Sequence, residues 1–403
     1  MYPADPLGAI PGGIDSFIRG MLRWAPEDFE IMLLGATTDV IKRPVRKWTT
    51  CRLGKQSFRF YPVLSLTDPG KQKRIPTSLT FTLALARSRE PVNADLLAFH
   101  GIEPILAFLR DRRPKTAVIH QDMRVLRNQG ADIRWRYMPW LYFGLERLLV
   151  SRLRSIFCVR QNAVENYRQR FPKIADRFLF TPTWVDTEVF GPPTLERRRA
   201  GRDRLQTEFG FAESDHVLIT VGRLDSQKNP MLLMESLDKV LLTHQNIRLL
   251  MVGEGQLRSE IESYASRRGF GDKIVLCGVR TSDTVAEYLH GADTFVLSSA
   301  YEGMPMCVLE ALGCGLPVVS TAVGEVDRVL RHRVNGELVS KQDAESFASA
   351  ILHCIAHSDQ YRGEPCVAAI QDFTVQKVLE PIFDNYRQLA VNAGLSSETK
   401  NRK

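Results

Sequence analysis

The stretch SSAYEGMPMCVLEALGCGLPVVST, residues 298–321, decides the fold class of this 403-residue chain. It contains the end of one apolar run, a short loop, an apolar helical pattern and a second apolar run. A strand, a helix and a strand in this order are typical of a parallel sheet with crossover helices. Outward from it, the same alternation predicts strands at 216–224, 247–255, 273–278, 294–299 and 316–321, and helices at 230–242, 257–269, 282–290 and 305–313. The back half is therefore predicted to be an α/β domain with a doubly wound parallel sheet.

The loop and helix start of this stretch suit a ligand that carries hydroxyl groups and negative charge. Gly303 allows the backbone to approach a ligand closely, and Pro305 suits the first position of a helix. The unpaired N–H groups at that helix start favour an anion. Glu302 on the loop and Glu310 on the helix can then bracket a ligand that lies across the helix start. Either carboxylate alone is more typical of an ordinary surface, but the complete string favours a binding site.

A second pattern, VGRLDSQKNP at 221–230, places two basic residues directly after a predicted strand. Arg223 supplies a forked donor for phosphate oxygens, and Lys228 supplies a mobile point charge. Alone, such residues are more typical of a solvated loop. Because ligands of doubly wound sheets bind at the carboxyl ends of the strands, this loop and the helix start together favour a diphosphate site.

The front half predicts a second α/β domain with a parallel sheet. Its strands are predicted at 29–37, 58–64, 94–101, 116–122, 155–159 and 177–182. The stretch VFGPPTLERRRAG, at 189–201, predicts a linker, and 373–391 predicts a final amphipathic helix. We therefore expect an N-terminal domain over 1–188 and a C-terminal domain over 189–365. Residues 366–403 are expected to form a helix that crosses back to the first domain, followed by a polar tail.

Composition excludes several classes of protein. Hydrophobic residues make up 44% of the chain and charged residues 25%, which is typical of soluble globular proteins. No run approaches the ~18 uninterrupted apolar residues of a membrane-spanning helix, and the first residues lack the pattern of a secretory signal. The seven cysteines contain no Cys-x-x-Cys pair. We therefore expect reduced thiols, no zinc site and a cytoplasmic protein.

Charge is divided unevenly along the chain, whose formal net charge is +8. Residues 1–180 carry 30 Lys and Arg against 16 Asp and Glu, whereas residues 181–403 carry 24 against 30. No RNA-binding motif accompanies the arginines of the front half, so nucleic acid is not expected as a partner. The excess of basic residues favours either a solvated helix face or a cytoplasmic surface that contacts anionic lipid.

Taken together, the back-half motifs resemble the nucleotide-sugar domain of retaining GT-B glycosyltransferases of the family 4, or group 1, type. The resemblance runs through VGRLDSQKNP, LLMVGEGQLRSEIE, YLHGADTFVLSSAYEGMPMCVLEALGCGLPVVST and VNGELV. It implies the GT-B fold, in which two Rossmann-like domains face each other across a cleft. It also implies a glycosyltransferase that moves a sugar from a nucleotide-diphosphate sugar to a saccharide or lipid-linked saccharide.

The same resemblance implies roles for individual residues of the back half. Arg223 and Lys228 match the basic loop that holds the donor diphosphate, and Glu310 matches the carboxylate that binds the ribose hydroxyls. The donor sugar is implied to contact three loop residues: Glu302, Gly303 and Met304. The nucleotide base is implied to rest against Val279 and Arg280. Arg223, Lys228 and Glu302 are also implied to contribute to catalysis, as is His120 of the front half.

The front half resembles the family more loosely. PGGIDSFIRGML, at 11–22, is similar to the glycine-rich turn and first helix, which implies that Gly12 and Gly13 approach the donor phosphate or the acceptor. The strand that precedes this turn in the family is reduced or missing here. His120 matches a histidine that touches the donor sugar or its phosphate, and His100 matches another histidine common in the family. Asp122 is a further candidate on the acceptor side.

The reaction implied by the resemblance is retaining, and the residues single out no nucleophile. No Asp-x-Asp pair stands at a strand end, so neither a metal nor another cofactor is expected. The leading expectation is an enzyme of bacterial surface polysaccharide synthesis that is peripheral at the inner face of the membrane. Two alternatives remain open: a nucleotide-sugar epimerase or phosphorylase on the same fold, and a degenerate sugar-nucleotide-binding module.

Overall fold

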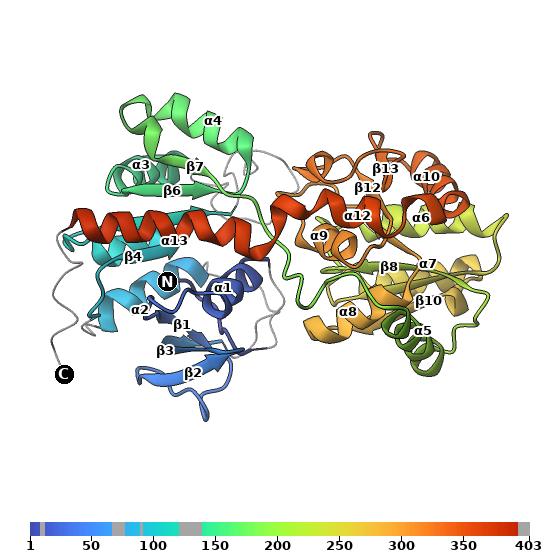
Figure 1. Ribbon diagram of the computed structural model, residues 1–403, viewed down its shortest axis with the longest axis horizontal. Helices are drawn as coiled ribbons and strands as arrows, with labels where there is room; N and C mark the ends of the chain where they lie inside the picture. The colour runs from blue at the N-terminus through green and yellow to red at the C-terminus, as the bar shows by residue number, and fades with distance from the viewer. Residues whose placement is uncertain (9–12, 67–76, 89–91, 121–138, 394–403) are drawn as a thin grey trace. The chain divides into compact units, whose positions relative to one another are not determined.

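The structure is a computed structural model that describes residues 1–8, 13–66, 77–88, 92–120 and 139–393. The contacts between residues divide the chain into two compact units (Figure 1). Unit 1 comprises Met1–Pro182 and Gln376–Lys403, and unit 2 comprises Thr183–Val375.

Unit 2 is built on a six-stranded parallel sheet with the strand order β10-β9-β8-β11-β12-β13. Its strands are β8 (His216–Val221), β9 (Ile247–Val252), β10 (Ile274–Gly278), β11 (Thr294–Leu297), β12 (Val318–Thr321) and β13 (Gly336–Val339). The chain starts in the middle with β8, runs outward to β10, returns to β11 beside β8 and then runs outward to β13. This doubly wound order creates a switch point between β8 and β11, the place where such sheets bind ligands.

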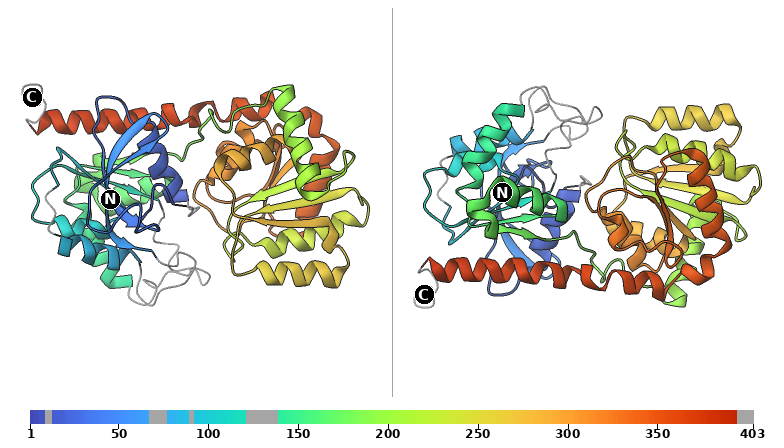
Figure 2. Two further views of the ribbon diagram at one scale, coloured as in Figure 1. Left: turned by 90° about the horizontal axis from the view of Figure 1, so that it is seen from below. Right: turned by 90° about the horizontal axis from the view of Figure 1, so that it is seen from above.

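Helices cover both faces of this sheet, as Figure 2 shows. They are α5 (Leu195–Phe209), α6 (Pro230–Leu241), α7 (Arg258–Arg268), α8 (Ser282–Gly291), α9 (Met306–Gly313), α10 (Ala344–Ala356), α11 (Ser358–Tyr361) and α12 (Glu364–Ala369). Val217 and Ile219 of β8 belong to the core formed with α5, α8 and α9. Leu218, between them, belongs to the core formed with α6, α7 and α10. A strand buried on both faces explains why its sequence is continuously apolar.

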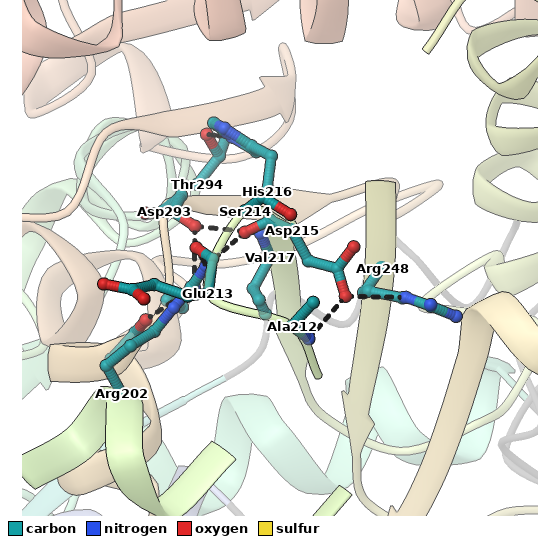
Figure 3. A network of polar contacts seen from close by, with 12 residues as sticks. Arg202, Ala212, Glu213, Ser214, Asp215, His216, Val217, Arg248, Asp293 and Thr294 are labelled. Carbon is teal, nitrogen blue, oxygen red and sulfur yellow. Dashed lines mark hydrogen bonds and ion pairs between the residues drawn. The ribbon is translucent and has the colours of Figure 1, made fainter. Parts of the chain in front are cut away.

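A polar network closes the opposite edge of the sheet, at the amino ends of β8, β9 and β11 (Figure 3). One carboxylate oxygen of Asp293 accepts hydrogen bonds from Arg202 Nη1 at 3.0 Å and from the Val217 backbone N–H at 2.9 Å. Arg248 Nε donates to Asp215 at 2.9 Å. Since its arginines come from α5 and β9, the network ties one helix to three strands.

Unit 1 contains a three-stranded sheet with the order β1-β3-β2 and a four-stranded parallel sheet with the order β4-β5-β6-β7. The strands are β1 (Met32–Thr37), β2 (Thr49–Leu53), β3 (Gln56–Ser65), β4 (Leu97–His100), β5 (Lys115–Ile119), β6 (Ser155–Cys158) and β7 (Phe178–Phe180). The helices are α1 (Gly13–Arg23), α2 (Thr77–Ser88), α3 (Pro139–Val150), α4 (Gln161–Arg170) and α13 (Val375–Asn392), with a 3-10 helix η1 at Glu103–Phe108.

The first four residues join these two sheets. The Tyr2 N–H donates to the Leu34 carbonyl of β1 at 3.3 Å, and the Ala36 N–H donates to the Ala4 carbonyl at 3.0 Å. On the other side, the His100 N–H of β4 donates to the Met1 carbonyl at 3.2 Å. Residues 1–4 therefore occupy the position of a reduced parallel strand between β1 and β4. With them included, unit 1 is also doubly wound, and its switch point lies between residues 1–4 and β4.

Four details differ from the sequence-based expectations. Residues 195–201 are not linker but the first turns of α5, which Thr194 caps by accepting from the Arg197 N–H at 3.2 Å. The front sheet is not wholly parallel, because β2 pairs antiparallel with β3. Pro305 is the N-cap of α9 rather than its first residue, because its ψ of 115° is extended. Strands β2 and β13 were not predicted, since both are short and carry charged residues.

The long helix α13 returns to unit 1. Its Arg387 forms a bidentate pair with Asp28, with nitrogen–oxygen distances of 2.7 and 2.8 Å, and its Phe383 packs edge-on against Phe29. No helix in the described ranges is both long and apolar enough to cross a membrane.

Candidate functional site

The loops that follow β8 and β11 meet at the switch point of unit 2. The loop after β8 carries the predicted Arg223 and Lys228, and the loop after β11 carries Glu302. The Ala300 N–H donates to the Gln227 carbonyl at 2.9 Å, which fixes the two loops against each other. Ser298 Oγ donates to the carbonyls of Lys228 and Asn229 at 3.1 and 3.0 Å. The basic loop and the acidic loop are thus one rigid structure rather than two independent segments.

Lys228 and Glu302 form the ion pair at the centre of this site. The Lys228 ammonium lies 2.6 Å from Glu302 Oε1, and Ser299 Oγ donates to the same oxygen at 2.7 Å. The side chain of Glu302 is 7% exposed and that of Lys228 is 20% exposed. Burial lowers the pKa of Lys228, but the neighbouring Cys307 thiol and Glu302 carboxylate raise it by more, so its pKa lies above the ordinary value. Lys228 is therefore a permanent cation, available to a second anion.

Arg223 lies at the open edge of the site. Its guanidinium is 58% exposed and contacts Asp225 at 3.0 Å and Gln227 Oε1 at 3.0 Å. Asp225 also accepts from the Lys228 backbone N–H at 3.1 Å, so one carboxylate organises both basic residues. An exposed guanidinium of this kind suits capture of a phosphate from solvent.

Glu310 lies on α9, whose start faces the same switch point. Burial raises the pKa of Glu310 from 4.5 to about 7, and the nearby charge of Lys228 opposes this rise. Near neutral pH this carboxyl group therefore exists in both protonation states. A carboxyl group held in this way can accept hydrogen bonds from hydroxyl groups of a ligand without forming a strong ion pair of its own.

The backbone between Glu302 and α9 is held from two sides. The Met304 carbonyl accepts from Thr183 Oγ1 at 3.0 Å, and the Gly303 carbonyl accepts from the Glu325 N–H at 2.8 Å. Gly324 approaches so closely that a Cβ atom there would lie 1.9 Å from the Gly303 carbonyl oxygen. Only glycine fits at this position, and its φ of +60° is also a conformation that favours glycine.

The predicted base-binding residues follow β10. Gly278 ends that strand with a φ of +76°, and Val279 beyond it is 39% exposed. The side chain of Arg280 contacts neighbouring side chains: its Nε donates to the Tyr288 hydroxyl at 3.3 Å, and its Nη2 lies 3.5 Å from Glu208. Val279 is thus an open apolar surface, and Arg280 is part of a network on the helix side.

In unit 1 the structure brings together the two predicted histidines. His100 and His120 lie at the ends of the neighbouring strands β4 and β5, and His100 Nδ1 lies 3.0 Å from His120 Nε2. Both line a cavity of about 180 Å³, together with Tyr2, Ser78 and Glu103 among others. Gly13 is the first residue of α1. Gly12 and Asp122 lie outside the described residues.

The sequence predicts neither a metal ion nor another cofactor at the site. Within the described ranges no group of three or more His, Cys, Asp or Glu side chains could hold a metal ion. All seven cysteines are free, and six of them are buried.

Comparisons with known proteins agree with this geometry. Residues 201–363 match the family model described as glycosyl transferases group 1. A D-inositol 3-phosphate glycosyltransferase from Geodermatophilus obscurus is 33% identical over 305 residues, which cover 72% of this chain and 66% of that protein. The chain belongs to the group 1 glycosyltransferases. Its fold is similar to that of sucrose-phosphate synthase from Thermosynechococcus elongatus, with a TM-score of 0.77, 18% identity, and coverage of 97% of this chain and 98% of that one. The fold is therefore GT-B.

Another relative of this group 1 glycosyltransferase is the Escherichia coli UDP-Gal:alpha-D-GlcNAc-diphosphoundecaprenol alpha-1,3-galactosyltransferase. It is 26% identical over 216 residues, which cover 52% of this chain and 54% of that protein. The chain spans about half the length of such curated relatives. The matched family region contains Arg223, Lys228, Glu302 and Glu310, whereas His100 and His120 lie outside it.

The candidate site of unit 2 also contains residues that the sequence did not single out. Ser299 orients Glu302, Asp225 and Gln227 hold the basic loop, and Gly324 admits the Gly303 carbonyl. Gly324 lies directly after the strand predicted at 316–321. A glycine at such a position could have been predicted to lie near the site. The contact of Ser299 with Glu302 had no such signal, because serine is common in loops.

Proposed function

We propose that this chain is a retaining glycosyltransferase that moves a sugar from a nucleotide-diphosphate sugar to a saccharide or lipid-linked saccharide. One observation carries the proposal: two cations, two carboxylates and a helix start converge at the switch point of unit 2. Arg223 and Lys228 suit a diphosphate, while Glu302 and Glu310 suit the hydroxyl groups of a sugar and a ribose. The name of the Escherichia coli relative supports a UDP-sugar donor and a lipid-linked acceptor. A role in bacterial surface polysaccharide synthesis remains part of the proposal.

The proposed reaction breaks the bond between the anomeric carbon and the diphosphate oxygen and forms a bond from that carbon to the acceptor oxygen on the same face. The acceptor proton passes to the departing phosphate. Negative charge grows on the diphosphate as the first bond breaks, and Lys228 with the N–H groups at the start of α9 would stabilise it. Because these groups supply the positive charge, we propose that no metal ion is required. Activity is then expected to be unchanged by EDTA.

Product analysis with UDP-, GDP- and ADP-sugars tests the proposed reaction. We expect release of the nucleoside diphosphate and an α-linked product from an α-linked donor, with at least ~100-fold slower release in Glu302→Gln, since buried polar groups at the reacting sugar act on the transition state. Lys239→Ala is the matched control, because Lys239 of α6 lies in an exposed pair with Glu345. Interconversion of two nucleotide sugars without release would identify an epimerase. Nucleotide binding without turnover would identify a degenerate module.

We also propose that unit 1 contacts an anionic membrane surface, where a lipid-linked acceptor would be presented. Arg147, Arg152 and Arg154 are exposed on and after α3 and support this proposal, since each basic residue near such a surface contributes about 1 kcal/mol. The full chain is expected to float with vesicles that contain phosphatidylglycerol and to be released by high salt, which screens the attraction. Equally weak flotation with anionic and neutral vesicles at low salt would contradict it.

A further inference from the structure

His100 and His120 make a direct contact between two ring nitrogens inside unit 1. His100 is 7% exposed, and the two rings are bounded on one side by Phe17 of α1, which is fully buried and meets both rings edge-on. The ring planes lie 17° apart and the ring centroids 5.3 Å apart. That centroid distance is close to the largest that a 3.0 Å nitrogen–nitrogen contact allows, so the rings meet edge to edge. Each nitrogen therefore faces the other in the ring plane, as a hydrogen bond requires.

Such a bond needs one nitrogen with a proton and one without. Burial holds the pKa of His100 well below its ordinary value, and burial lowers the pKa of His120 to about 3, so both rings are neutral at physiological pH. A neutral imidazole has one donor nitrogen and one acceptor nitrogen. If His100 Nδ1 donates, His120 must carry its own proton on Nδ1; if His100 accepts, His120 must carry it on Nε2. The tautomer of one ring therefore dictates the tautomer of the other.

The histidine pair lies at the edge of unit 1 where doubly wound sheets bind their ligands. His100 and His120 stand at the carboxyl ends of adjacent parallel strands, beside the switch point formed by residues 1–4 and β4. They line the cavity of about 180 Å³ together with Ser78 and Glu103. Because His120 Nε2 faces His100, the other nitrogen of His120, Nδ1, is the one left for a ligand.

We propose that His100 is a positioning residue that holds the ring of His120 in its orientation and ties the tautomer of His120 to its own, and thereby controls whether His120 Nδ1 meets a ligand as a donor or as an acceptor. The proposal rests on the proposed function and on the resemblance, which implies that His120 touches the donor sugar or its phosphate. Orienting partners of this kind are known to set which nitrogen of a histidine is protonated.

Spectroscopy tests the tautomer without any need for activity. In protein labelled with ¹⁵N-histidine, protonated and unprotonated ring nitrogens have well separated chemical shifts. We expect complementary protonation of the two facing nitrogens in the wild type, and a changed ratio of the His120 tautomers in His100→Phe, which keeps an aromatic ring and removes the hydrogen bond. An unchanged ratio of the His120 tautomers in His100→Phe would overturn the proposal.

Kinetics test the consequence for sugar transfer. We expect His100→Phe to lower kcat about tenfold or more with little change in the donor KM, because a positioned acid or base typically contributes about 10²–10⁴-fold and part of this is lost when the group is misplaced. In a His120→Phe background the same substitution is expected to change kcat less than about twofold, since a residue that acts through another is not additive with it. An equal loss in both backgrounds would overturn the proposal. Absence of transfer by the wild type, with the tautomer shift still present, would instead count against the proposed function.

Discussion

At the scale of single residues, the switch point of unit 2 combines groups that stabilise and groups that cost stability. Lys228 and Glu302 neutralise each other within a largely buried pair, and Ser299 satisfies the carboxylate further. Glu310 forms no comparable ion pair with any described residue, and burial raises its pKa. A raised pKa at a carboxyl group near Lys228 supports the proposal that Glu310 binds a ligand.

Lys228→Ala is expected to weaken UDP binding by about 10- to 100-fold, because a hydrogen bond to a charged group is worth about 1.5–3 kcal/mol. The loss also leaves Glu302 without its cation, so the variant should unfold at a lower temperature. Isothermal titration calorimetry with UDP measures the affinity, and Lys239→Ala is the control. A dissociation constant close to that of the wild type would show that Lys228 does not hold the diphosphate.

Glu310→Gln is expected to be stabilising in a pH-dependent way. A carboxyl group whose pKa is raised on folding contributes stability below its unfolded pKa and loses that stability as pH rises through the folded value. For Glu310 the window runs from 4.5 to about 7, and the loss is at most about 3 kcal/mol. The variant should therefore gain melting temperature relative to the wild type above this window but not at its lower end. A constant difference at both pH values would contradict the raised pKa.

At the scale of elements, the site depends on loops that approach each other at glycines. A Cβ atom at Gly253 would lie 1.8 Å from the Gly222 carbonyl oxygen, and one at Gly324 would lie 1.9 Å from the Gly303 carbonyl oxygen. Each pair joins two loops that follow neighbouring strands. In these loops the regular pairing of the strands has ended. The strands set the coarse positions of the loops, and these backbone contacts set the fine positions.

Gly324→Ala is expected to displace the loop from Glu302 to Met304 and to weaken UDP binding at least about tenfold, in addition to the ~1 kcal/mol cost of a side chain at positive φ. Gly210→Ala is a matched control, since Gly210 has a φ of +71° and a Cβ atom added there would meet no described atom within 4 Å. It should lose stability alone. Equal UDP affinity in the two variants would mean that the Gly324 contact does not shape the site.

At the scale of the whole molecule, unit 2 has charged networks at both edges of its sheet, and only one of them belongs to the candidate site. In unit 2 the candidate site lies at the carboxyl edge of the sheet, and the network of Arg202, Asp215, Arg248 and Asp293 lies at the amino edge (Figure 3). In unit 1 the histidine pair lies at a carboxyl edge as well. Substitutions at the amino edge of unit 2 should therefore change stability with little effect on ligand affinity.

Asp293→Ala is expected to destabilise unit 2 by about 2 kcal/mol or more, because it leaves Arg202 and the Val217 N–H without their shared acceptor. UDP affinity measured well below the melting temperature should stay close to that of the wild type. Glu345→Ala, at an 81% exposed side chain, is the control for loss of a carboxylate. A large loss of UDP affinity in Asp293→Ala would show that the two edges of the sheet are coupled.

The sequence by itself determined the alternation of strands and helices, the α/β class and the positions of Arg223, Lys228, Glu302 and Glu310 after strands or at a helix start. These follow from local signals: apolar periodicity, glycine and proline at element ends, and the spacing of charged residues. The tertiary structure alone decided the rest. The strand-like pairing of residues 1–4, the start of α5 at Leu195, the bond between His100 and His120, and the approach of Gly324 to Gly303 all join segments through pairing or packing that no local pattern records.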